Sequence, residues 1–415
     1  MFHRMVNGNG KTKWQEKRKE YIDSCTLHGF SKACSARGLE KMLWFSLLVG
    51  SSVLICLATK NVIEKYQSRE FFTETRSIYP QGLDLPSLTL CNDYRLLPKQ
   101  KQNIKSFSEE FYRFAQFYPD FCTVGHQRCT IKEFKPFGKN KACFTFTPTE
   151  EQRQMYPGLF YGLQLFLFIN KTKETVYGIL DEDVRISIHE KNEIPQIFFN
   201  YIPLTSGTAN KITIRKTLQK RLPSPYPSNC IRGHKHTSSI FPGHYTRYSC
   251  ISSCFLTTSY EKCGGILSNV YESYVPDYIK NKSKSNTTDN EMERCLWKVV
   301  KAYGGENAPP ICECQVPCEE IDYNEKTQTT PLSINGIRSS LKSEFLNDLT
   351  DEEILNSFYK INVFYQKFQY QIIAEKPAYS LTQAMGDFGG QVGLIFGASI
   401  LTLIELFVII FLRFK

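Results

Sequence analysis

Two long apolar segments interrupt a chain in which hydrophobic and polar positions otherwise alternate over short distances. The first runs from Met42 to Ala58 and extends through Ile63. The second runs from about Val392 to Leu412, after a glycine-rich approach that begins at Gly386. Because about 20 helical residues cross the roughly 30 Å hydrocarbon core of a bilayer, the pattern predicts transmembrane helices at 42–63 and 386–412.

The charges around the first segment predict its orientation. Roughly 40 residues precede it and no small-residue cleavage site follows it, which is unlike a cleaved signal peptide. Lysine and arginine are dense before it, at 11–19 and again at Lys32, Arg37 and Lys41. The positive-inside rule therefore predicts cytoplasmic segments at 1–41 and 413–415 and an outer region at 64–385, and we expect the membrane to be the plasma membrane.

Composition limits the remaining classes. The mean hydropathy of −0.32 excludes a bundle of many membrane spans. The formal net charge of +10 is compatible with a nucleic-acid partner, but the basic residues are scattered and part of the excess belongs to the predicted cytosolic segment. We therefore expect the lipid bilayer, and not nucleic acid, as a partner.

Cysteine usage agrees with an extracellular region. The chain has 15 cysteines, and an even set lies between the two apolar segments: Cys91, Cys122, Cys129, Cys143, Cys230, Cys250, Cys254, Cys263, Cys295, Cys312, Cys314 and Cys318. Outside the cell such a set predicts disulfides, although CECQVPC could chelate zinc in a cytosolic protein. Sequons at Asn170, Asn281 and Asn286 lie in the same region and predict glycosylation.

The extracellular region contains two kinds of sequence pattern, one typical of strands and one typical of helices. Short runs rich in β-branched and aromatic residues predict strands: SLTLC, CFTFT, YGLQLFLFI, VRISIH and KINVFYQKFQYQII. Residues 94–120, NEMERCLWKVVKAY and SSLKSEFLNDLTDEEILNSFYK have helical spacing, the last with a start or restart near Asp348. Strands from distant parts of the chain and a cysteine-rich helical lobe at about 250–318 predict an α+β fold.

The second apolar segment has an unusual composition for a lipid anchor. It contains three consecutive small residues, Gly397, Ala398 and Ser399, with Asp387 at its outer end and Glu405 deeper inside. Small residues form helix-packing seams in membranes, whereas intramembrane carboxylates mark functional pathways. These residues alone leave a packing seam and a polar pore lining equally open.

Motifs spread over nearly the whole chain match one pattern. They are His28-Gly29, LPSLTLCN at 85–92, KACFTFT at 141–147, the cysteine series from Tyr248, CECQVPC at 312–318, and GDFGGQVGLIFGAS at 386–399. Together they resemble the epithelial sodium channel, degenerin and acid-sensing channel superfamily. The resemblance implies a trimeric channel whose subunits have two transmembrane helices and a disulfide-rich α+β ectodomain of palm, finger and thumb type.

The resemblance also implies residue roles. Gly397, Ala398 and Ser399 match the cation selectivity filter, and Asp387 would be a cation site at the pore mouth. Gly386 matches the degenerin position, His28 and Gly29 match a pair that influences opening, and Tyr226 stands where the family has a wrist tryptophan, although the local spacing differs by one residue. Glu405 remains a candidate for the inner pore.

Disulfide pairing is likewise implied by the resemblance. The expected pairs are Cys91–Cys143, Cys122–Cys129, Cys230–Cys318, Cys250–Cys314, Cys254–Cys312 and Cys263–Cys295. One further bridge of the family's thumb is absent, since Gly265 replaces its first cysteine.

The opening stimulus is less specified. The stretch after the first segment, QSREFFTET, lacks the histidine pair of acid-sensing members, while Arg185 keeps a positive charge at their subunit boundary and His234 and His236 could titrate. We expect an amiloride-sensitive sodium channel, with calcium as a second permeant ion and an extracellular peptide as its ligand. Proton gating, constitutive opening and a modulatory, non-conducting subunit of a heterotrimer remain alternatives.

Two other classes fit less well. A two-span receptor of the ATP-gated kind shares the topology but not these cysteine and Gly-Ala-Ser motifs. No nucleophile–base pair and no metal-spaced ligand set indicates an enzyme, and no cofactor or metal is expected.

Overall fold

The computed structural model divides the chain into two compact units. The membrane unit comprises Met1–Phe72, Pro225–Pro227 and Lys376–Lys415, and the ectodomain unit comprises Thr73–Ser224 and Ser228–Glu375. The structure describes residues 27–92, 107–118, 120–138, 142–169, 184–197, 200–232, 239–265, 271, 274–282, 289–304, 312–340, 346, 349–402, 404 and 407.

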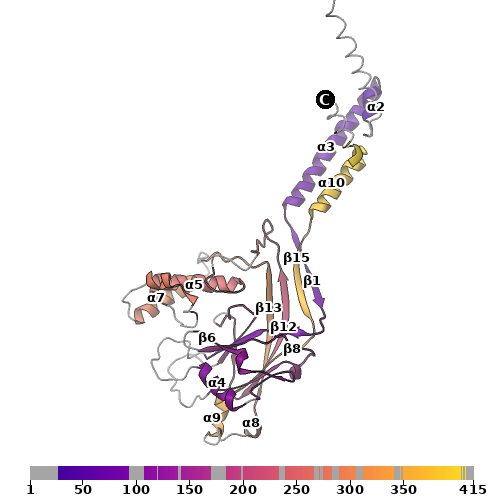
Figure 1. Cartoon of the computed structure of the whole chain (residues 1–415). Coiled ribbons are helices and arrows are strands. Elements are labelled where there is room, and N and C mark those ends of the chain that lie inside the picture. The colour runs from indigo at the N-terminus through magenta and orange to yellow at the C-terminus, as the bar shows by residue number, and fades with distance from the viewer. Residues whose placement is uncertain are drawn as a thin grey trace, which may run out of the picture. The chain divides into compact units, whose positions relative to one another are not determined.

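Three helices form the described part of the membrane unit: α2 (Phe30–Ser35), α3 (Leu39–Gln67) and α10 (Leu381–Phe396). Helix α3 has 29 residues and a mean hydropathy of 2.0 over its most apolar window, and none of it is buried within the chain. Within the described ranges it is the one helix long and apolar enough to cross a membrane. Helix α10 lies beside it (Figure 1) and begins at Leu381, five residues before the predicted second span.

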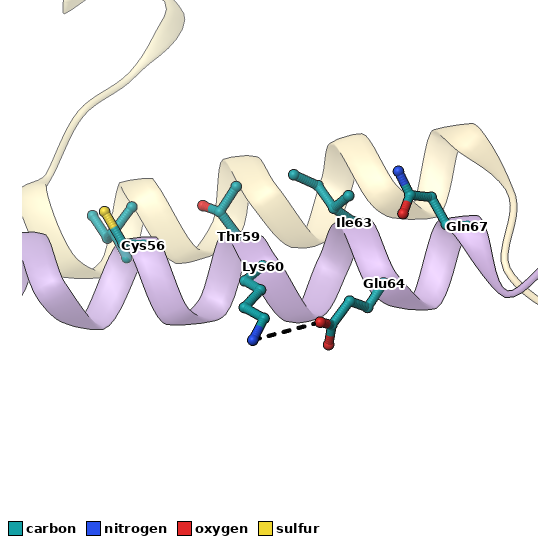
Figure 2. Close-up of a pocket in the computed structure, with 7 residues that line it drawn as sticks. Cys56, Thr59, Lys60, Ile63, Glu64 and Gln67 are labelled. Carbon is teal, nitrogen blue, oxygen red and sulfur yellow. Dashed lines mark ion pairs between the residues drawn. The ribbon is translucent and has the colours of Figure 1, made fainter.

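A shallow groove of about 490 Å³ lies along α3 near its C-terminal end, lined by Ile55, Cys56, Thr59, Lys60, Ile63, Glu64 and Gln67. Figure 2 shows Thr59, Ile63 and Gln67 on the side where the pale ribbon of α10 lies, and Lys60 and Glu64 on the opposite side. Lys60 Nζ and Glu64 Oε1 are 3.6 Å apart and largely exposed. Charged residues thus begin about one turn before the end of the apolar stretch.

The larger sheet of the ectodomain unit joins distant parts of the sequence. Its strand order is β1-β15-β12-β14-β9-β4-β5, with β13 also paired to β12. The strands are β1 (Phe71–Ile78), β4 (Cys122–Val124), β5 (Gln127–Arg128), β9 (Leu163–Phe168), β12 (Thr208–Lys220), β13 (Glu319–Pro331), β14 (Phe358–Tyr365) and β15 (Tyr370–Pro377). Strand β12 runs antiparallel to β13 over its whole length and parallel to β14 and β15.

A second sheet has the order β11-β10-β3-β7-β6, and a short ladder joins β2 to β8. The strands are β2 (Leu83–Asp84), β3 (Ser87–Asn92), β6 (Phe134–Phe137), β7 (Cys143–Phe146), β8 (Arg153–Gln154), β10 (Val184–His189) and β11 (Ile202–Leu204), with 3₁₀ turns η2 (Ile131–Glu133) and η3 (Leu159–Tyr161). Strand β3 is buried at every position. Helix α4 (Phe107–Phe117) packs Phe111 on Phe144 with ring centroids 4.1 Å apart, inside one hydrophobic core shared by both sheets.

The cysteine-rich lobe is inserted between β12 and β13. It contains α5 (Arg247–Cys263), α6 (Asp277–Lys282) and α7 (Asp289–Gly304), and Figure 1 shows α5 and α7 side by side. The Cys230–Cys318 disulfide closes its base, directly before β13 begins. The other disulfides are Cys91–Cys143, Cys122–Cys129, Cys250–Cys314, Cys254–Cys312 and Cys263–Cys295, so the six pairs are those that the resemblance implies.

Most strand predictions coincide with observed strands. The five predicted runs correspond to β3, β7, β9, β10 and the β14–β15 pair, which a turn at 366–369 separates. In the predicted helix at 94–120, residues 107–117 form α4, and residues 94–106 lie outside the described ranges. The restart near Asp348 is α9 (Asp351–Ser357), capped by Thr350, after α8 (Ile334–Ser340). The two longest strands, β12 and β13, were not predicted, because most of their residues are polar.

Gln154 joins the β8 segment to the end of β14. Its side chain is fully buried; Nε2 donates to the carbonyls of Tyr365 (3.1 Å) and Tyr156 (2.7 Å), and Oε1 accepts from the Tyr365 N–H (2.8 Å). Gln152 is similarly buried two residues earlier, but it bonds to Glu133 and Thr149 instead.

We therefore expect Gln154→Leu to lower the free energy of unfolding by about 1–3 kcal/mol, because it leaves the buried Tyr365 N–H without an acceptor. Amide hydrogen exchange should locate the loss at Tyr365 and the 366–369 turn. Gln152→Leu, the matched control, should leave exchange at Tyr365 unchanged. Equal exchange at Tyr365 in wild type and Gln154→Leu would contradict this assignment.

Candidate pore and gating site

The predicted filter residues lie where the second apolar helix is interrupted. Helix α10 ends at Phe396, and Gly397 is its C-cap, with a left-handed φ of 65° and its N–H bonded to the Gly393 carbonyl at 2.9 Å. Helical structure resumes at Ile400. Glycine is the residue that adopts this conformation without steric cost. The small residues therefore mark a break in the backbone.

His28 holds the end of α10 from the side. The backbone N–H of His28 donates to the Phe396 carbonyl at 2.9 Å, and the imidazole Nδ1 of His28 lies 3.3 Å from the same oxygen. The imidazole occupies the space that a side chain at position 397 would need, because a Cβ built on Gly397 overlaps the ring. The structure thus brings together two of the predicted sites, His28 and Gly397, from opposite ends of the sequence.

Gly29 adopts a left-handed conformation at the start of α2. Its φ is 80°, and a Cβ at this position would lie 3.3 Å from the Trp44 ring of α3. Lys32 Nζ also lies over the Trp44 ring, 4.9 Å from its centroid. The His-Gly pair is therefore a turn that packs on the first apolar helix and reaches the break in the second.

Ser399 caps the short helical piece after the break. The Ser399 N–H donates to Thr402 Oγ1 at 3.1 Å, and the Thr402 N–H is 3.4 Å from Ser399 Oγ. This reciprocal arrangement satisfies N–H groups that a helix start leaves unpaired. Ser399 itself is exposed, whereas Thr402 is buried.

Asp387, in the first half of α10, has a defined partner. Tyr379 Oη donates to Asp387 Oδ2 at 2.6 Å, and this hydrogen bond to a carboxylate raises the pKa of Tyr379 to about 12. The Lys65 ammonium lies over the Tyr379 ring, 4.5 Å from its centroid. Gly386, next to Asp387, has open space around its Cβ position.

Tyr226 belongs to the membrane unit although the sequence around it does not. The Arg69 side chain hydrogen-bonds to Tyr66 and Tyr226, and its guanidinium stacks on the Tyr66 ring at 4.0 Å. The Glu70 carbonyl accepts from the Ala378 N–H at 2.9 Å, so the segments after α3 and before α10 are also joined.

Partly buried carboxyl groups gather in the ectodomain unit beside β10 and β13. Glu190 Oε2 accepts from Tyr323 Oη at 2.9 Å and lies 3.4 Å from Lys216 Nζ. Burial, together with repulsion from Glu190, Glu320 and Asp322, raises the pKa of Glu193 to about 8, and burial raises the pKa of Glu325 to about 7. These side chains can exchange protons near neutral pH.

His189 lies close to these carboxyl groups, but its imidazole is uncharged at neutral pH. Burial lowers the pKa of His189 to about 4. Its Nδ1 is 3.0 Å from the Glu190 carbonyl and its Nε2 is 2.9 Å from Thr89 Oγ1, so both ring nitrogens are satisfied in the neutral form.

Several predicted sites are not brought to the pore region or are not placed. Arg185 lies in the ectodomain unit, with its guanidinium 4.1 Å from the Tyr201 ring centroid. Glu405, His234, His236, Asn170 and Asn286 lie outside the described residues; Asn281 falls in α6, whose backbone alone is described there. Within the described ranges, no group of three or more His, Cys, Asp or Glu side chains is arranged to hold a metal ion.

Other functional candidates were missed from the sequence. Tyr379, Arg69 and Glu193 are single residues without a motif, and only the structure shows their partners. Helical spacing could not have found Tyr379, because it precedes α10, which begins at Leu381.

The break after α10 predicts that position 397 requires glycine. Gly397→Ala should abolish current, because the new Cβ overlaps His28 and alanine in a left-handed conformation costs about 1–2 kcal/mol. Gly393→Ala, one turn earlier, meets only the Ala398 carbonyl at an ordinary 3.6 Å and should conduct normally. Whole-cell current normalised to surface protein distinguishes the two variants. Normal current through Gly397→Ala would contradict the observed break.

Comparison with known proteins places these features in one family. The model of the family described as amiloride-sensitive sodium channel matches residues 21–120 and 117–409. The chain is 24% identical to acid-sensing ion channel 4-B of Danio rerio, over 93% of this chain and 74% of that protein. It is 23% identical to acid-sensing ion channel 1 of Gallus gallus, over 93% and 82% of the two chains.

A degenerin is also similar. Degenerin del-1 of Caenorhabditis elegans is 29% identical over 68% of this chain, which spans only 42% of that protein. The matched family is one of ion channels and not of enzymes. Since the family model covers nearly all of the sequence, including both apolar helices and the break between Phe396 and Ile400, the chain belongs to the amiloride-sensitive sodium channel family.

Proposed function

We propose that this protein is a pore-forming subunit of a trimeric, amiloride-sensitive cation channel that conducts sodium across the plasma membrane. The main supporting observation is the interruption of the second apolar helix at Gly397. His28 contacts the end of α10 there, and Ser399 caps the helical piece that follows. Family membership supports sodium transport, and the apolar α3 supports a membrane location. Both chain ends would lie in the cytoplasm.

The interruption provides the chemistry that a cation filter needs. A continuous helix uses its carbonyl groups internally, whereas a helix end leaves carbonyl oxygens without intrahelical partners. Gly397, Ala398 and Ser399 have no bulk to keep neighbouring copies apart. Around a threefold axis, their carbonyl and hydroxyl oxygens would replace part of the hydration shell of a sodium ion.

The same geometry gives Asp387 a role at the pore mouth. Three copies of this carboxylate would concentrate cations there and offer oxygen ligands to calcium. The hydrogen bond from Tyr379 fixes the carboxylate and shares its charge. Calcium is therefore proposed as a permeant or blocking ion, and related subunits as partners in homo- or heterotrimers.

A variant that is open at rest tests this proposal directly, because its current can be measured without knowing the stimulus. Gly386 has open space around it within the subunit, so Gly386→Val should fold and then prevent closure only by contact between subunits. Cells expressing this variant alone should carry a standing current that amiloride blocks and that reverses near the sodium potential. Voltage clamp with sodium, potassium and calcium solutions measures the selectivity.

Gly50→Val is the matched control, because Gly50 in α3 also has open space around it. This variant should remain closed at rest. A Gly386→Val channel that stays closed, with normal surface expression, would contradict the proposal and favour the modulatory subunit.

Two stimuli remain for the wild-type channel. The expected peptide ligand has no specific support among the described residues. Proton gating is supported by Glu193 and Glu325, because burial raises their pKa values to about 8 and about 7. Acidification from pH 8 to 6 would neutralise carboxyl groups on and beside β13, one of the strands that borders the cysteine-rich lobe.

Under proton gating, Glu325→Gln should make the response to pH less steep, since the glutamine is permanently neutral. Its midpoint should move by about half a pH unit. The folded protein binds this proton more tightly than the unfolded chain, so wild-type stability should also rise as pH falls from above 7 toward 4.5. Glu319→Gln, at an exposed ion pair with Lys220, is the control.

Current against external pH and melting temperature at pH 8 and pH 6 provide the two measurements. If Glu325→Gln and wild type give the same pH response, this residue does not carry the proton response. A current evoked by amidated peptides at constant pH, with no response to acid, would favour the peptide ligand.

A further inference from the structure

Strand β15 carries a carboxylate whose partners lie on one short loop. Glu375 Oε2 accepts hydrogen bonds from the Leu222 N–H at 2.8 Å and from Ser228 Oγ at 2.6 Å. These two donors are 153 and 147 residues away in the sequence. In the part of the chain that the structure describes, Glu375 forms no ion pair, so two neutral donors are what hold it.

The loop that Glu375 holds is stiff. Residues 222–230 read LPSPYPSNC, and the prolines at 223, 225 and 227 each fix a backbone dihedral. The Cys230 N–H lies 3.4 Å from the Leu222 carbonyl, which closes the loop on itself. Leu222 and Ser228 lie near the two ends of this loop, so the hydrogen bonds to Glu375 hold both of its ends.

Both ends of the loop are attached to the ectodomain unit. On one side β12 ends at Lys220, opposite Ala374 of β15. On the other side Cys230 is bonded to Cys318, the residue before β13, and the Arg221 N–H donates to the Cys318 carbonyl at 2.8 Å. The loop is therefore the base from which the cysteine-rich lobe begins.

The two elements that Glu375 joins lead to different parts of the gating apparatus. Tyr226, which contacts Arg69 near the end of α3, is two residues before Ser228 in the sequence. Strand β15 ends two residues after Glu375, and α10 begins at Leu381. A displacement of the loop relative to β15 has to break the hydrogen bonds to Glu375.

We propose that Glu375 is a positioning residue for channel opening, which keeps the 222–230 loop in register with the strand that continues into α10. This inference rests on the proposed function. The acceptor oxygen is what the geometry requires, since both partners are neutral donors. The negative charge makes the bonds stronger but is not needed to form them.

The test compares four variants of the full chain in the same cells. Glu375→Ala removes the acceptor, Ser228→Ala removes one donor, and Glu375→Gln keeps an acceptor oxygen. Glu319→Ala removes an exposed carboxylate from β13 and is the control. Stimulus concentration for half-maximal opening, measured with acid and with amidated peptides, is the functional readout.

Glu375→Ala should shift half-maximal opening by about tenfold, the scale of a lost hydrogen bond to a charged group. Ser228→Ala should shift it in the same direction by less, and the double variant should not exceed Glu375→Ala. Glu375→Gln and Glu319→Ala should stay within about twofold of wild type. An unchanged Glu375→Ala, additive effects in the double variant, or equal damage from Glu375→Gln would each overturn the assignment.

A second measurement does not depend on current. Hydrogen exchange at the Leu222 amide of the purified full chain should accelerate at least about tenfold in Glu375→Ala and stay unchanged in Glu375→Gln. Unchanged exchange in Glu375→Ala overturns the proposed positioning contact. If Gly386→Val carries no current while the exchange result is as expected, the channel proposal fails and the contact stands only as a structural one.

Discussion

The backbone leaves the helical conformation at Gly397, and much of the membrane unit is arranged around that break. A left-handed residue ends α10, the Phe396 carbonyl needs another donor, and His28 supplies its N–H. His28 can reach this carbonyl only because Gly29 turns the chain and packs on Trp44. Loss of the His28 contact would leave the Phe396 carbonyl without this donor. The motifs at the two ends of the sequence are parts of one local structure.

In the ectodomain unit, disulfide bonds, and not single hydrogen bonds, hold distant segments together. The cysteine-rich lobe contains short helices with a small apolar core of its own around Cys263, Leu296 and Val299. Its disulfides supply the cohesion that so small a core lacks. The Cys230–Cys318 bond then fixes the lobe to β12 and β13, whose backbone ladder extends over 13 residues of each strand. Rigid elements therefore lie on both sides of the lobe's base.

The sequence predicted the features that depend on composition and periodicity. Apolar length predicted α3, short runs of apolar, aromatic and β-branched residues predicted β3, β9 and β10, and motif resemblance implied the cysteine pairs. It did not predict β13, because EEIDYNEKTQTTP is polar and gains its order from pairing with β12. Partners that depend on long-range geometry were also out of reach. Neither the His28–Phe396 contact nor the Glu375–Leu222 bond leaves any signature in local spacing.

The length of α3 has a mechanical consequence for the bilayer. Its 29 residues extend about 43 Å as a helix, whereas the stretch between Lys41 and Lys60 covers roughly 27 Å, close to the hydrocarbon thickness. The Lys60–Glu64 pair therefore sets a boundary that resists moving into lipid. A thicker membrane would have to thin locally or make the helix stand more upright, and a thinner one would tilt it. Because α10 lies against this helix, a tilt imposed on α3 by the bilayer would also act on α10.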